Sequence, residues 1–113
     1  MYQSIATFIL ASKPYGALYV DYAEDLSGSV LDHKCNIVGG VTSLYAIHTL
    51  VYYEYHLDIK DAMSRKWEIE ALHRIWKLDL IDRQNPEWRD LYPDINPVQD
   101  SILNTQDSLL FQD

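Results

Sequence analysis

The chain has 113 residues, of which 48% are hydrophobic and 12% are aromatic. This composition excludes a disordered protein, and the length suits one small domain with a modest core. The formal net charge of −8 argues against direct binding of nucleic acid or of an anionic membrane, because both repel an acidic surface. We expect instead a protein partner, and a basic or nucleic-acid-handling protein would suit this charge.

The cysteine content and the N-terminus favour a cytoplasmic protein. Cys35 is the only cysteine, which rules out an internal disulfide and is typical of a reducing compartment. The first residues carry no basic group, and the apolar run over residues 5–11 is shorter than most signal-peptide cores and far shorter than a membrane span. We expect no cofactor.

A short apolar element at residues 4–12 is followed by a predicted helix. Pro14 suits the first turn of that helix, and Gly28 suits the position just after its last turn. A stripe at helical spacing is formed by Tyr15, Leu18, Tyr22 and Leu26. The alternative is a strand at residues 17–23 in a hairpin with residues 29–38, because apolar residues also alternate there.

Two glycines, Gly39 and Gly40, raise the question of a phosphate-binding loop. A Walker-type loop needs a lysine and a hydroxyl residue directly after its second glycine, whereas Val41 follows here. We therefore interpret the glycines as a chain break, and Thr42 or Ser43 is predicted to cap the next helix.

The next predicted helix extends over residues 42–55. Its apolar face consists of Leu44, Ile47, Val51 and Tyr55. His48 lies within this face, where a core histidine is a more common outcome than a metal ligand. The many β-branched and tyrosine residues keep a strand open as the alternative.

The longest predicted helix extends over residues 58–82. Asp58 suits the N-cap, Asp61 suits the first turn, and no Gly or Pro interrupts the segment. At 1.5 Å per residue, such a helix would be roughly 37 Å long.

This helix has two apolar faces. One consists of Ala62, Ile69, Leu72, Trp76 and Leu80, and the opposite one of Met63, Trp67, Ala71 and Leu78. A helix with two apolar faces either runs through the centre of the domain or presents one face to another chain. We predict that Trp76 points inward and is more buried than Trp67, and that Met63, Trp67 and Leu78 bind a partner.

After Pro86 the character of the chain changes, and residues 91–113 form a proline-marked C-terminal arm with four aspartates and no base. A Gln-Asp-Ser step followed by two aliphatic residues occurs at 99–103 and recurs at 106–110. We predict that the arm docks on another protein, by helix-in-groove binding or strand addition, and the alternative is packing on its own domain. The predicted partner-binding residues of the arm are Asp100, Leu103, Asp107, Leu109, Leu110 and Phe111.

The search for catalytic and metal-binding motifs is negative, and we predict no catalytic residue and no metal ligand. Carboxylate pairs at i, i+3 occur at Asp21/Glu24, Asp58/Asp61 and Glu87/Asp90. Pairs of this kind can hold Mg²⁺ in some all-helical hydrolases, but 17 acidic residues in 113 produce them readily by chance. Residues 32–35 offer a histidine and a cysteine, which are too few for a structural zinc site.

These features predict a mostly α fold. A small helical domain at residues 1–90, with one long central helix at about 58–82, would be followed by the arm at residues 91–113. The alternative is an α+β fold in which an N-terminal hairpin at about 17–38 packs on two helices.

The leading functional hypothesis is a small acidic, non-catalytic protein that blocks or adapts another protein. Inhibitors, immunity proteins and anti-defence proteins of phages or bacteria share this size and charge, an argument by analogy. The first alternative is a structural component of a virion or multi-subunit complex whose arm docks on a neighbour. The second is a Mg²⁺-dependent all-α hydrolase. Because the long helix has two apolar faces, we also expect that the protein could form a homo-oligomer.

Overall fold

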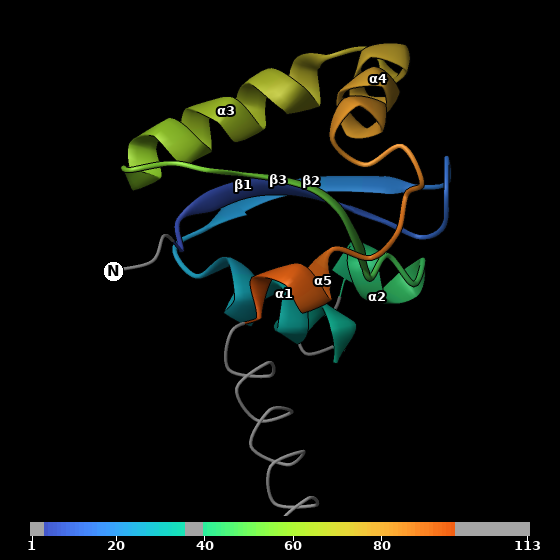
Figure 1. The fold of residues 1–113 in the computed structure, drawn as a ribbon, viewed down its shortest axis with the longest axis horizontal. Coiled ribbons are helices and arrows are strands. Elements are labelled where there is room, and N and C mark those ends of the chain that lie inside the picture. Colours follow the sequence, from blue (N-terminus) through green and yellow to red (C-terminus); the bar gives the residue numbers. More distant parts are fainter. Residues whose placement is uncertain (1–3, 36–39, 97–113) are drawn as a thin grey trace, which may run out of the picture.

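The computed structural model describes residues 4–35 and 40–96 of the chain. In this part, a three-stranded antiparallel sheet of order β2-β1-β3 lies between two layers of helices (Figure 1). The strands are β1 (Ala6–Ala11), β2 (Leu18–Ala23) and β3 (Thr49–Tyr55). The helices are α1 (Leu26–Lys34), α2 (Gly40–Leu44), α3 (Ile59–Ala71), α4 (Arg74–Gln84) and α5 (Tyr92–Ile95). The prediction of a mostly α fold is therefore wrong, and the class is α+β.

The first two strands form a hairpin where a helix was predicted. The N–H of Gly16 donates to the Lys13 carbonyl at 2.9 Å in the turn, and β2 then pairs with β1 along its whole length. The alternative strand at residues 17–23 is thus present, but its partner is not residues 29–38, which lie partly in α1. The apolar spacing fits both structures, and pairing with β1 decides between them.

Strand β3 occupies the second half of the helix predicted over residues 42–55. It pairs with the other edge of β1, with a register shift between Ile9 and Leu10. Thr42 and Ser43 lie inside the short helix α2 and do not cap a longer one. The β-branched and tyrosine content of β3 suits a strand packed on both faces better than a helix.

The outer edge of β3 is closed by the segment that ends α4 and follows it. Gln84 accepts from the Tyr53 N–H at 3.0 Å and donates to the Tyr53 carbonyl at 2.8 Å. Further along the strand, the Leu91 N–H donates to the Leu50 carbonyl at 2.8 Å, and Asp90 accepts from the Leu50 N–H at 3.2 Å. These groups bond the edge much as another strand would, which protects it from pairing with a foreign strand.

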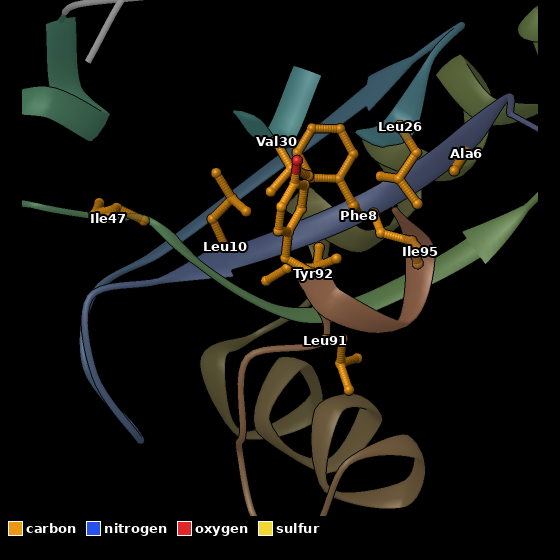
Figure 2. Close-up of a cluster of buried hydrophobic side chains, with 10 residues drawn as sticks. Ala6, Phe8, Leu10, Leu26, Val30, Ile47, Leu91, Tyr92 and Ile95 are labelled. Atoms are coloured by element: carbon orange, nitrogen blue, oxygen red, sulfur yellow. The ribbon is translucent and has the colours of Figure 1, made fainter. Parts of the chain in front are cut away.

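Strand β1 is buried along its whole length, because helices cover both faces of the sheet. Beneath the sheet in Figure 1 lie α1, α2 and α5, and above it lie α3 and α4. One hydrophobic cluster (Figure 2) consists of Ala6, Phe8, Leu10, Leu26, Val30, Ile47, Leu50, Leu91, Tyr92 and Ile95. The cluster on the opposite face consists of Ile9, Ala11, Val20, Val51, Tyr52, Ile69, Ile81 and Trp88.

The long helix predicted over residues 58–82 is two helices. Leu72 and His73 adopt extended backbone conformations, with ψ of 145° and 153°, although no Gly or Pro marks the break. In one straight helix Ile69 and Ile81 would point about 120° apart. The break lets both side chains enter the same cluster fully buried, so tertiary packing outweighs local propensity here.

The start of α3 follows the prediction. Asp58 is the N-cap, and its carboxylate accepts from the Lys60 N–H at 2.8 Å. Asp61 lies in the first turn, where a negative charge is favoured by the helix dipole.

Helix α5 belongs to the core. Leu91, Tyr92 and Ile95 are buried against α1 and the sheet, so the first residues of the predicted C-terminal arm pack on their own domain. Residues 97–113, the rest of the arm, lie outside the described part of the chain. Among the described residues, no helix combines the length and the apolar character needed to cross a bilayer.

Candidate protein-binding surface

The bend between α3 and α4 carries three large apolar side chains that water reaches. Trp67 and Trp76 are each 56% exposed, and Ile75 is 69% exposed. Grouped exposed aromatic and aliphatic side chains are typical of protein-binding surfaces. The prediction that Trp76 is more buried than Trp67 is wrong, because α4 begins anew at Arg74 and buries Ile81 instead of Trp76.

Both tryptophans lie near the bend. Trp67 stands one turn, about 6 Å along the helix axis, before the last residue of α3, and Trp76 lies in the first turn of α4. The end of α3 and the start of α4 are joined by two residues only. The apolar side chains are therefore presented at the same end of this helix pair.

Two basic residues flank the exposed apolar pair in the first turn of α4. Arg74 donates to the carbonyls of Tyr15 and Gly16, at 2.7 and 2.8 Å, so its guanidinium is held by neutral groups. Lys77 has no carboxylate partner among the described residues. The two cations therefore keep their charge available to a partner.

The carboxylates of α3 and α4 near the bend are paired with residues other than Arg74 and Lys77. The ion pairs are Glu68–Arg65 at 3.3 Å, Glu70–Lys66 at 3.3 Å and Asp79–Arg83 at 2.9 Å. Asp82 accepts from the Tyr15 hydroxyl and from Trp88 Nε1. We call the resulting apolar and positively charged area the helix-bend surface, and its residues are Trp67, Arg74, Ile75, Trp76 and Lys77.

The N-terminus of α4 adds to this positive character. Its N-cap is His73, whose side chain makes no capping hydrogen bond, and its first turn contains no acidic residue. Helix α3, by contrast, has the carboxylates of Asp58 and Asp61 at its start. The partial positive charge of the α4 terminus is therefore not offset by a carboxylate in its own first turn.

The structure distributes the sequence-predicted partner-binding residues differently. Three of these residues were predicted on one helical face. Of them, Trp67 is exposed, Met63 is half-buried, and Leu78 packs against the hydrophobic cluster between α4 and the sheet. The predicted residues of the arm, from Asp100 to Phe111, lie outside the described part of the chain.

Sequence reasoning missed most of the helix-bend surface. Ile75 was not assigned to either face, and Arg74 and Lys77 were not considered as binding residues. A usable signal was present, because the four-residue stretch 74–77 places two adjacent apolar residues between two bases. On an inward-facing turn, such flanking charges would have to be buried.

A second group of exposed apolar residues lies on the other side of the sheet, at α2. It consists of Val41, Leu44 and Tyr45. Helix α2 has only five residues, none of them charged, so this group lacks the cations of the helix-bend surface.

A polar network joins β3 to α3. One oxygen of Glu54 accepts from Arg65 Nε at 2.7 Å and lies 3.1 Å from His56 Nε2, and the other accepts from the Tyr52 hydroxyl. Burial, with the neighbouring carboxylate, raises the pKa of Tyr52 to about 12. Because both oxygens of Glu54 are engaged, this network acts as a clamp between strand and helix.

The other side of the sheet holds a buried histidine. His33 Nδ1 lies 3.0 Å from the Thr42 hydroxyl, and the His33 ring packs against Tyr19 with 5.4 Å between centroids. Burial lowers the pKa of His33 and, with the charge of Asp21, raises that of Tyr19 to about 12. His48 precedes β3, and its buried Nε2 has no hydrogen-bond partner among the described residues.

The metal-binding candidates are not brought together. Within residues 4–35 and 40–96, no group of three or more His, Cys, Asp or Glu side chains is placed to hold a metal ion. Cys35 is free and exposed.

The fold and this surface define a small α+β protein whose most distinctive exposed feature is an aromatic, positively charged helix bend. No family model and no solved structure matches the chain. It is 32% identical over 66 residues to UPF0213 proteins from two strains of Staphylococcus epidermidis, an alignment that covers 58% of this chain and 80% of each relative. The chain belongs to the UPF0213 family, whose name states no activity.

Proposed function

We propose that this protein is a non-catalytic protein-binding protein that uses the helix-bend surface to block or adapt a partner. One observation carries the proposal: two tryptophans and an isoleucine at the α3–α4 bend are each more than half exposed, and Ile75 and Trp76 stand between two cations without a carboxylate partner in the described chain. Tryptophan and arginine are the residues most enriched where binding energy is concentrated. The cytoplasm is the proposed setting, since the only cysteine is free.

The charge of this surface refines the expected partner. The net charge of −8 suggested a basic partner, but residues 59–84 contain six Lys or Arg against five Asp or Glu, a local charge of +1. The other residues must then carry −9. An acidic partner surface therefore suits the helix bend better than a basic one does, because complementary charge speeds association and excludes wrong partners.

Site-specific photo-crosslinking in host cells tests the proposal. A photoreactive phenylalanine at position 76 should give a discrete adduct with a second protein chain. The matched control is position 45, since Tyr45 is as exposed as Trp76 but directly follows α2, a helix on the opposite side of the sheet from α4 (Figure 1). Adding Ile75→Glu to the position-76 probe should remove the adduct, because it places a charge at an apolar anchor.

Equal adducts from positions 76 and 45 would show that exposure alone produces them, and the proposal would fail. It would also fail if position 76 gave no adduct while the protein was abundant and folded.

A further inference from the structure

The acidic tail, residues 98–113, complements the helix-bend surface in both charge and polarity. The tail has three aspartates, Asp100, Asp107 and Asp113, and no Lys or Arg. Its large apolar residues are Ile102, Leu103, Leu109, Leu110 and Phe111. An acidic segment with paired aliphatic residues suits a surface that combines exposed tryptophans with unneutralised cations.

The tail begins on the side of the sheet opposite to α3 and α4, which carry the helix-bend surface. Helix α5, just before the tail, packs with α1 on one face, and α3 and α4 cover the other face (Figure 1). Within one molecule the tail would have to wrap around an edge of the sheet to reach the opposite face. A second molecule can bring its helix-bend surface to the tail directly.

We propose that the acidic tail of one copy docks on the helix-bend surface of a second copy. The inference rests on the proposed function and names the partner as another molecule of this chain. The aliphatic residues of the tail would cover Trp67, Ile75 and Trp76, and its aspartates would face Arg74 and Lys77. Two copies that exchange tails would form a closed dimer with two equivalent contacts.

This arrangement explains how chains with a net charge of −8 can associate. The contact pairs an acidic segment with a part of the molecule whose local charge is positive, so the long-range repulsion is offset where the chains meet. The exposed apolar group on α2 lacks bases within the helix and does not offer the same complementarity.

Sedimentation velocity on the full-length chain, over roughly 1–200 µM, tests the inference. The surface variant carries Ile75→Glu and Trp76→Glu, the tail variant carries Leu109→Asp and Leu110→Asp, and the control variant carries Leu44→Glu on α2. Wild type and control should self-associate. The surface and tail variants should each raise the dimer dissociation constant by about tenfold or more.

The decisive measurement is a mixture of the two defective variants. The tail variant keeps an intact surface and the surface variant keeps an intact tail, so an equimolar mixture should form a one-to-one complex although each alone is monomeric. Circular dichroism checks the fold of every variant, and Trp76→Ala replaces the surface variant if the double change unfolds it. Association should also weaken as salt is raised.

Three outcomes would overturn the inference. The tail variant could self-associate like wild type, the mixture could stay monomeric, or wild type could be monomeric throughout. In each case an adduct from position 76 to a different protein would leave the proposed function standing. If position 76 gives no adduct and the surface variant self-associates like wild type, both the inference and the proposed function fail.

Discussion

Trp76 lies in the first turn of α4 and Trp88 follows the end of that helix. The two tryptophans differ in burial, because Trp88 is in the core and Trp76 faces water. Trp88 is 4% exposed, its ring lies 4.5 Å from the ring of Tyr15, and its Nε1 donates to Asp82 at 2.6 Å. Its backbone has a positive φ of 53°, which is uncommon for a bulky residue and is tolerated where the surroundings hold it. Trp76 is 56% exposed, and no hydrogen bond or ring contact of its side chain is found among the described residues.

The contrast shows how α4 is anchored. Around Trp88, the contacts to Asp82 and Tyr15 join the end of α4 to the β1–β2 turn, which should stabilise the fold. Around Trp76, apolar area faces water, which contributes little to folding and is available for binding. One end of α4 thus supports the domain, and the other end carries the helix-bend surface.

The strongest test of this contrast removes each tryptophan in turn. Trp88→Ala should lower the free energy of unfolding by about 3–5 kcal/mol, as truncation of a buried large side chain does. Trp76→Ala should change it by less than about 0.5 kcal/mol, because the side chain is largely in water already. Urea denaturation followed by far-UV circular dichroism measures both without relying on tryptophan fluorescence. A comparable loss for the two variants would contradict the assignment of Trp76 to a binding surface.

The partner of Trp88 provides a smaller test. Asp82→Ala should cost about 1–2 kcal/mol, because the partly buried indole N–H of Trp88 then loses its acceptor. Asp79→Ala, on the same helix, removes only an exposed i, i+4 pair with Arg83 and should cost less than about 0.5 kcal/mol. Thermal unfolding of both variants at one pH and salt concentration makes the comparison. If Asp79→Ala is the costlier change, the anchoring role of Asp82 is wrong.

The smallest expected effects concern the two helix starts. Asp58→Ala removes the cap of α3 and should cost about 1 kcal/mol. His73→Asp supplies the missing cap to α4 and should stabilise it by about 0.5 kcal/mol. The same change places a negative charge beside Arg74, so it should also weaken self-association. Urea midpoints give the stabilities, and sedimentation velocity gives the association. A His73→Asp protein that is no more stable would mean that the α4 terminus is satisfied in another way.

Features that depend on neighbouring residues could be predicted from the sequence. The cap at Asp58 and the acidic first turn of α3 were found because a capping carboxylate acts on amides two or three residues away. The helix predicted after Pro14 and the one predicted over residues 42–55 were wrong, because the same residues gain more from pairing with β1. The β1–β3 pairing joins segments far apart in the chain, and the β1–β2 hairpin, although local, has an apolar spacing that also fits a helix.

The sequence by itself determined that the chain folds, that it is acidic, and where α3 begins, since these depend on composition and on contacts within one turn. The tertiary structure alone decided that β1 pairs on both edges and that α3 and α4 separate at residues 72–73. It also decided which tryptophan is buried. The physical reason is common to all three: burial of Ile69, Ile81 and Trp88 in one cluster requires a geometry that only the assembled sheet provides.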